Sequence, residues 1–434
     1  MKISERFVRL LLVSLIGLSL YFSYNIWLSP AHTKRFSTDT KQLVTENQNY
    51  RKMTDTFLPL QLAWLQEDTI KGTQSENLIS QVQEQLAKDT VGVLAVVVYQ
   101  NEKDFAEYLQ ISEGIELLYE SPFSLAEYLK IYHFDIKDSD EAENYLFSKV
   151  QIDFTNQQVN FMNVKEHTVY QLAFSGKADK YQQIMAEKMP NLLDVTRDNT
   201  YNLGRYNIDE SISLKKYSYI LSTQSFTLFS NAFFQDVENV NNETNSVYSS
   251  GEERLTVNAG NIEQLVDFRG QLPLETGLDN VYTQSFDYVK KLGTNFGNLR
   301  YFDRDKNTVN YRFLVEGYPV FSEFSQGLLS VTADSTVSED SKAIHIQGST
   351  NTIQVPIPSD EVAELQPTAT IKDELLAAGV EESEISSIII GYTWESIEGN
   401  TRVVNLTPEW YVCYSGTWYQ AEKLIQQSQV KEAD

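Results

Sequence analysis

Residues Leu10–Leu28, LLLVSLIGLSLYFSYNIWL, decide how the rest of this chain is placed. The stretch contains no charged side chain, and a helix of this length spans roughly the 30 Å hydrocarbon core of a bilayer. Three basic residues and one acidic residue precede it, and basic segments stay on the cytoplasmic side of a membrane helix. We therefore predict a cytoplasmic tail over residues 1–9, a transmembrane helix over residues 10–28 and an extracytoplasmic remainder.

A cleaved signal peptide is the alternative to a retained helix. The apolar run is longer than a typical signal-peptide core. No A-x-A motif precedes the place where cleavage would fall, near Ser29, Pro30 and Ala31. Basic residues also follow the run closely, but a short basic tail is harder to export than a long acidic domain. We therefore expect one retained helix that anchors the chain in the cell membrane.

The chain beyond this helix is strongly acidic and rich in aromatic residues. Of 35 basic and 60 acidic residues, three and one lie in residues 1–28, which leaves 32 against 59 and a net charge of −27. Such a surface repels nucleic acid, so nucleic-acid binding is excluded. With 25 Tyr and 22 Phe, the chain has ample material for packed cores. Cys413 is the only cysteine, so no internal disulfide can form, and we expect its thiol to be buried.

Hydrophobic periodicity predicts an α+β fold in the extracytoplasmic part. The apolar run Val91–Tyr99 is typical of a central strand, and Glu238–Glu253, rich in Asn, Ser, Thr and Glu, is interpreted as a linker or long loop. Helices are predicted at residues 76–88, 124–131, 179–189, 278–292 and 369–378. Further strands are predicted at residues 149–154, 158–163, 169–174, 298–302, 308–315, 385–394 and 401–406.

These elements group into three parts. We predict an N-terminal α+β domain at 33–230, a middle α+β domain at 250–335 and a C-terminal α+β domain at 340–425. The last two can be overlaid as similar units of one helix followed by an antiparallel sheet, with a two-residue insertion in the hairpin turn. The overlay pairs Tyr301 with Tyr392, Asn307 with Asn400, and Tyr318 with Tyr411.

No residue pattern predicts catalysis, a cofactor or a metal site. The four histidines are far apart in sequence and lack paired ligand spacing. Ser213–Lys216 matches S-x-x-K, but its S-D-N and K-T-G partners are missing. Asp303, Asp305 and Asn307 begin like a calcium loop, but Thr308 stands where that loop needs Gly. A hairpin turn explains these residues better, and we expect a protein without enzymatic activity.

The predicted membrane helix carries the candidate partner contacts. Ser14, Gly17, Tyr21 and Asn25 follow a 3, 4, 4 spacing, which places small and polar groups on one stripe of the helix. Small residues allow close helix approach, and polar groups in hydrocarbon favour a protein partner. The alternative is that Tyr21 and Asn25 lie at the outer interface and that Ser14 bonds its own backbone. We name this set of four residues the small-polar stripe.

Several of these features together resemble a known family. They are the basic tail, the span that ends in YNIWLSP (Tyr24–Pro30), EGYPVF (Glu316–Phe321), and GYTW with PEWYVCYSGTW inside Gly391–Trp418. The chain resembles the YycH (WalH) family of low-GC Gram-positive bacteria over essentially its whole length. An exported chain without disulfides agrees with such an envelope.

This resemblance implies a fold, a function and partners. Members of the family are membrane-anchored and have an extracytoplasmic part of three domains, of which the second and third resemble each other and the partner YycI. The family implies a regulator that acts with YycI on the sensor histidine kinase YycG (WalK), which controls cell-wall metabolism, partly through contacts between transmembrane helices. It implies no catalytic residues. The alternative is an anchored cell-envelope ligand-binding module or a wall-modifying enzyme.

Overall fold

The structure is a computed structural model, and it separates residues 1–48 from a compact unit of residues 49–434. It describes residue 15 and residues 50–136, 142, 145–186, 192–198, 205–244, 246–258, 264–273, 281–338, 341–397 and 400–433. None of the helices among these residues is both long and apolar enough to cross a bilayer. The predicted span lies outside the described residues except for Leu15, which is helical and exposed.

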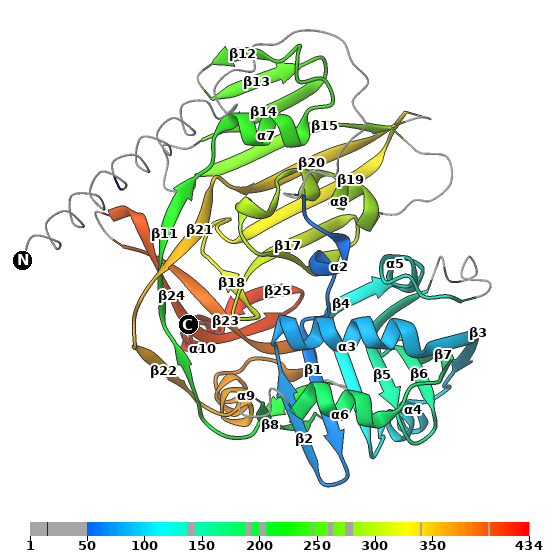
Figure 1. The fold of residues 1–434 in the computed structure, drawn as a ribbon. Helices are drawn as coiled ribbons and strands as arrows, with labels where there is room; N and C mark the ends of the chain where they lie inside the picture. Colours follow the sequence, from blue (N-terminus) through cyan, green and yellow to red (C-terminus); the bar gives the residue numbers. More distant parts are fainter. Residues whose placement is uncertain are drawn as a thin grey trace, which may run out of the picture. The chain divides into compact units, whose positions relative to one another are not determined.

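The first half of the compact unit forms a nine-stranded sheet (Figure 1). All its strand pairs are antiparallel, and the strands predicted at 149–154 and 158–163 are confirmed and form a hairpin near its centre. In sheet order the strands are β3 (Thr90–Val98), β7 (Thr168–Phe174), β6 (Gln158–Asn163), β5 (Leu146–Asp153), β4 (Gly114–Ser124), β1 (Gln61–Gln66), β2 (Thr69–Thr73), β8 (Leu193–Arg197) and β9 (Tyr206–Ile208).

Helices cover both faces of this sheet. Helices α3 (Glu76–Asp89) and α6 (Ala178–Ala186) lie beside each other on one face (Figure 1). The predicted helix at 76–88 is confirmed, and its apolar residues at helical spacing are all fully buried: Leu78, Ile79, Val82 and Leu86. Helix α4 (Glu102–Leu109) packs on the opposite face through Phe105 and Leu109, against Met162 and Val169. Both faces of the central strands are therefore buried.

Strand β3 corrects one prediction. Val91–Tyr99 does form a strand, but it lies at the edge of the sheet, so its predicted central position is wrong. Val91, Val93, Val96, Val97 and Val98 are exposed. A continuous apolar run is typical of a strand buried on both faces, and periodicity alone cannot show that the strand has a neighbour on only one side.

The second half is built on a larger sheet. The path runs through β12 (Asn241–Thr244), β13 (Val247–Ser250), β14 (Glu253–Val257), β15 (Leu265–Pro273), β20 (Ser341–Ser349), β19 (Leu328–Ser338), β17 (Thr308–Val315), β18 (Tyr318–Phe321), β23 (Ile385–Ile397), β24 (Asn400–Tyr414), β11 (Tyr217–Thr223) and β21 (Asn351–Ile357). Strand β16 (Leu299–Asp305) pairs with β17, and β25 (Thr417–Gln420) pairs with β24. A separate pair joins β10 (Ile212–Lys215) to β22 (Val362–Leu365).

Two strands of this sheet replace a predicted loop. The segment Glu238–Glu253 contains β12 and β13, so the interpretation as a linker or loop is wrong. All four residues of β12 are exposed, so this strand has no buried face that would require alternating apolar residues. Strand β12 is held by backbone pairing with β13. Its polar composition therefore does not indicate a strand.

Each of the two predicted similar units contains a helix followed by a hairpin. Helix α8 (Val281–Lys291) precedes β16 and β17, and α9 (Thr368–Ala377) precedes β23 and β24. The turn at Asp305–Thr308 closes the first hairpin, which confirms the hairpin interpretation of the acidic residues there. Tyr301 and Tyr392 lie on the first strand of their hairpins, whereas Tyr318 is on the separate strand β18 and Tyr411 is on β24 itself.

An aromatic cluster joins the two halves. Helix α2 (Met53–Thr56) leads into Phe57, whose ring stacks on Phe123 at 5.2 Å and contacts Tyr301 at 5.7 Å. The hydroxyls of Tyr282 and Tyr301 both donate to the carbonyl of Pro122, at 3.0 and 3.1 Å. The first sheet and the α8 to β17 segment therefore share one hydrophobic core. Further α-helices among the described residues are α5 (Leu125–Ile131), α7 (Phe226–Phe233) and α10 (Ala421–Ala433). The division into three domains stays a prediction.

Candidate functional site

A row of polar side chains crosses four neighbouring strands of the first sheet. The strand register places Glu116 on β4 opposite Gln151 on β5, Gln151 opposite Asn160 on β6, and Asn160 opposite Gln171 on β7. The neighbours of these residues along each strand point to the opposite face and enter the apolar core under α3 and α6. We call these four residues the polar row. Glu116, Gln151 and Asn160 are completely or almost completely buried.

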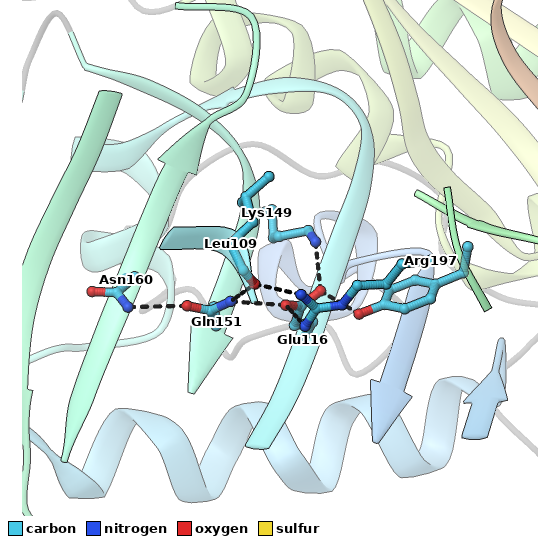
Figure 2. Close-up of polar contacts among 7 residues, drawn as sticks. Leu109, Glu116, Lys149, Gln151, Asn160 and Arg197 are labelled. Carbon is cyan, nitrogen blue, oxygen red and sulfur yellow. Dashed lines mark hydrogen bonds and ion pairs between the residues drawn. The ribbon is translucent and has the colours of Figure 1, made fainter. Parts of the chain in front are cut away.

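Glu116 is the charged end of the polar row, and two cations face it (Figure 2). Lys149 Nζ lies 2.5 Å from Glu116 Oε2, and Arg197 Nη2 lies 3.1 Å from Glu116 Oε1. Gln151 Nε2 donates to Oε1 at 2.9 Å, and the hydroxyl of Tyr206 donates to Oε2 at 2.5 Å. Lys149 is almost fully buried. Four donors therefore converge on one buried carboxylate.

Burial and neighbouring charges together set the charge states of Glu116 and Lys149. Burial alone would raise the pKa of Glu116, but the attraction of Lys149 and Arg197 outweighs it and holds that pKa below its ordinary value. Burial, assisted by repulsion from Arg197, lowers the pKa of Lys149, and the carboxylate of Glu116 opposes this shift. Glu116 is therefore an ionised acceptor at neutral pH.

The ionised carboxylate sets the direction of the amides along the polar row. A carboxylate can only accept hydrogen bonds, so Gln151 directs its Nε2 to Glu116 and its Oε1 toward the next residue. Asn160 Nδ2 donates to that Oε1 at 3.1 Å, and Gln171 Nε2 donates to Asn160 Oδ1 at 3.2 Å. Each amide points its donors toward Glu116. The charge of Glu116 thus fixes the hydrogen-bond directions on β4, β5, β6 and β7. Strand β7 is the neighbour of the edge strand β3.

The same network holds the connection to the second half. Arg197 ends β8 and also donates to the carbonyl of Leu109 at 2.6 Å. Arg205, just before β9, pairs with Glu120 at 2.9 Å. Burial raises the pKa of Glu120, and the opposing attraction of Arg205 is weaker than this effect of burial. Ile208, the last residue of β9, donates its backbone N–H to Thr368 Oγ1 on α9 at 2.9 Å. The ion pairs of Arg197 and Arg205 therefore lie on either side of the β8 to β9 step, and β9 contacts α9 of the second half through Thr368.

The two aromatic sequence motifs meet at a second feature. Residues of β18 pair in parallel with β23, with Val320 opposite Tyr392. The rings of Phe321 and Tyr411 stack with centroids 4.0 Å apart. The guanidinium of Arg312 lies 4.1 Å from the centroid of Phe321, and burial lowers the pKa of Arg312 to about 10. Tyr318 and Tyr411 are both buried, so the motifs contribute to hydrophobic cores.

Two glycines of these motifs allow close approach. A Cβ on Gly391 would lie 2.6 Å from the ring of Phe321, so only Gly lets β23 accept β18 at this point. Gly317 has φ +85°, and a Cβ there would lie 2.0 Å from the carbonyl oxygen of Gln74 in the first half. Arg300 donates to the carbonyls of Leu58 and Pro59 close by, at 2.6 Å each. The motif EGYPVF therefore belongs to the joint between the two halves.

A cleft of about 920 Å³ opens at this joint. Side chains of both halves line it, among them Glu120, Arg205, Asp303, Arg312 and Trp418. Asp303 accepts from Trp418 Nε1 at 3.0 Å, Arg205 pairs with Glu120, and Arg312 covers an aromatic ring. The charges named here already have partners within the protein. They stabilise the joint.

Known proteins resemble this chain in sequence and in fold. The sequence model of the YycH protein, N-terminal domain, matches residues 5–190, and that of the YycH protein, C-terminal domain, matches residues 205–429. The chain belongs to the YycH family. The crystal structure of YycH from Bacillus subtilis superposes with a TM-score of 0.66 at 13% sequence identity, and the match covers 86% of this chain and 97% of that one. No curated protein matches this sequence.

Membership of the YycH family supports a regulatory role in the YycG (WalK) two-component system. The family models divide the chain between residues 190 and 205, an interval that contains β8 and ends just before β9. The structural match shows the mixed α+β fold. It carries no residue roles across at this identity.

The small-polar stripe lies outside the described residues, so Ser14, Gly17, Tyr21 and Asn25 stay predictions. Over the part of the chain that the structure describes, no group of three His, Cys, Asp or Glu residues could hold a metal ion. Cys413 is buried as expected, and burial raises the pKa of its thiol.

The sequence carries a signal for the polar row. Glu116 stands between Ile115 and Leu117, and Gln151 stands between Val150 and Ile152, so each polar residue alternates with buried apolar ones. Such alternation normally indicates a face in water. The sequence does not show that α4 and the second half cover this face, so burial of the charges could not be predicted.

Proposed function

We propose that this protein is a membrane-anchored regulator without catalytic activity, which acts with YycI on the sensor histidine kinase YycG (WalK) and so modulates cell-wall metabolism. The observation that carries the proposal is the match of both YycH family models, which together extend from residue 5 to residue 429. In this proposal residues 10–28 form one membrane helix, the N-terminus is cytoplasmic and the folded unit is extracytoplasmic.

The folded unit supports a role in transmitting contacts. Its two halves share an aromatic core and are joined further by Arg300 and by the pair of Arg205 with Glu120. A rigid unit passes a force on its surface to its anchor, whereas freely hinged domains would absorb it. Control of a kinase requires contacts that differ between its two states, and a coupling of roughly 1–3 kcal/mol is typical.

The small-polar stripe is the proposed contact with the kinase's membrane helices. Replacing Ser14, Gly17, Tyr21 and Asn25 together by Leu removes the close-packing surface and keeps the helix apolar. We expect this variant to co-purify with YycG at a clearly reduced yield from membranes that contain both proteins. The measurement is the ratio of kinase to tagged protein after mild detergent extraction.

The matched control changes four residues of the same predicted helix that lie outside the stripe: Leu11→Ile, Leu12→Ile, Leu15→Ile and Phe22→Leu. It should retain the kinase at the wild-type ratio, because large apolar residues remain facing lipid. Equal kinase recovery with the stripe variant and with wild type would refute the helix contact. Loss of YycG regulation on deletion of the gene, with recovery by the control variant only, would test the wider proposal.

A further inference from the structure

The cleft at the joint of the two halves holds a cation that is not paired with a carboxylate. Arg312 on β17 lines this cleft of about 920 Å³. Its Nη1 donates to the carbonyl of Val320 at 3.1 Å, and its Nε is buried without a partner. Among the described residues, no carboxylate lies within ion-pair distance of this guanidinium, and Nη2 makes no hydrogen bond. Arg312 therefore has a charge and a donor available.

The acidic residues deeper in this cleft are already engaged. Asp303 accepts from Trp418 Nε1 at 3.0 Å and from Asn310 Nδ2 at 2.7 Å. Glu120 accepts from both terminal nitrogens of Arg205, at 2.9 and 3.2 Å. A carboxylate that is occupied in this way does not turn toward a further cation without losing its present bonds. An anion that reaches Arg312 must therefore come from outside the protein.

An aromatic platform fixes the position of the guanidinium. Its central carbon lies 4.1 Å from the ring centroid of Phe321 and 5.1 Å from that of Phe302. Phe321 in turn stacks on Tyr411 at 4.0 Å. A planar guanidinium on a ring stack is preorganised, so a ligand does not have to immobilise a flexible side chain when it binds. The cation is held ready in the cleft.

The charges of the lining indicate what kind of ligand fits. Five basic and four acidic side chains line the cleft. Arg312 and exposed Lys165 are the basic ones to which this argument applies, and exposed Glu102 and Asp305 are acidic ones without an ion pair among the described residues. A ligand with repeated negative charges would meet four carboxylates, and a purely basic one would meet five cations. A ligand that carries both signs of charge matches this lining best.

We propose that this cleft binds a short peptide with free ammonium and carboxylate groups. A carboxylate of the peptide pairs with Nη2 of Arg312, and an ammonium group lies near Asp305. The volume is in the range of known ligand sites. Lys165 belongs to the first half and Arg312 to the second, so a bound peptide bridges the two halves. This gives a regulator an input in its folded unit, and it does not depend on the membrane helix.

Titration calorimetry of the full-length protein in detergent tests the site. The probe is the tetrapeptide Ala-Glu-Lys-Ala with free termini, and we expect saturable binding. Arg312→Gln should raise the Kd at least about tenfold, because it removes a charge-assisted hydrogen bond. Lys165→Gln should raise it about threefold, as expected for an exposed charge. The matched control is Lys177→Gln, an exposed lysine outside the cleft, which should leave the Kd unchanged.

A second set of measurements separates binding from folding. Arg312→Gln also alters the aromatic platform, whereas Asp305→Asn changes an exposed side chain. Asp305→Asn should therefore weaken binding about threefold at an unchanged thermal midpoint. The uncharged peptide acetyl-Ala-Gln-Gln-Ala-amide should not bind. No binding of the charged peptide at millimolar concentration, equal Kd values for Lys165→Gln, Asp305→Asn and Lys177→Gln, or binding of a glycerol phosphate oligomer in place of the peptide would each overturn the proposal.

Discussion

Replacing Glu116 by Gln is expected to lower the free energy of unfolding by about 3–5 kcal/mol, the cost of leaving a buried charge without its partner. The magnitude follows from burial, since Glu116 is 0% and Lys149 2% exposed. Gln keeps the size of the side chain and removes only its charge. Lys149 and Arg197 would then face each other without a carboxylate between them.

The assay is equilibrium urea unfolding of the purified protein, followed by circular dichroism. The double variant Glu116→Gln with Lys149→Met removes both charges, and it should recover most of the loss because the unpaired buried ammonium is gone. The control is Asp287→Asn, which breaks the exposed pair with Lys290 and should cost less than about 1 kcal/mol. A loss for Glu116→Gln no larger than that of this control would refute the reasoning.

The same variant has a pH signature. The folded-state pKa of Glu116 lies below its ordinary value because Lys149 and Arg197 outweigh the effect of burial. A carboxyl group with a depressed pKa stabilises the fold above its ordinary titration range, and this stabilisation is lost as the pH falls through the folded-state pKa. The difference in stability between wild type and Glu116→Gln should therefore be full at neutral pH and should shrink in acid.

Two further substitutions test the joint between the halves and the packing of the first half beside it. Gly317→Ala should reduce stability by more than the roughly 1–2 kcal/mol of a left-handed backbone conformation, because its Cβ would also meet the carbonyl of Gln74. Gly416→Ala, at φ +77° and with open space around it, should show the backbone cost alone, and equal midpoints in thermal unfolding would contradict the close approach. Tyr119→Phe removes the 2.6 Å hydrogen bond to the carbonyl of Phe57 and should lower the free energy of unfolding by about 1–3 kcal/mol in the same urea assay. An unchanged value would show that the carbonyl finds another donor.

Much of the fold could be predicted from local patterns. Helical spacing in residues 76–88 and alternation around the hairpin at 149–163 each identified their elements, because these segments bury one face against a core. The predictions for Val91–Tyr99 and Glu238–Glu253 failed where burial does not follow from local sequence. An apolar strand at an edge and a polar strand in water both break the usual link between composition and position in a sheet.

The candidate site was harder to predict than the fold. Glu116, Lys149 and Arg197 lie on three different strands and come together only through strand order. Sequence alternation places Glu116 and Gln151 on one face of the sheet, but it does not reveal what covers that face. The glycines of EGYPVF and GYTW are visible in the sequence, whereas their close neighbours, Gln74 and Phe321, are far away along the chain.

The strand order of the large sheet has a consequence for how the protein is made. The hairpin β23 to β24 is the last long one in the chain, yet it lies between β18 and β11, which were synthesised far earlier. Until β23 and β24 are synthesised, the sheet consists of two separate pieces, each with an unpaired strand edge. A ribosome that stops before residue 385 would therefore release a product that lacks these two central strands of the large sheet. Quality-control proteases should remove this product.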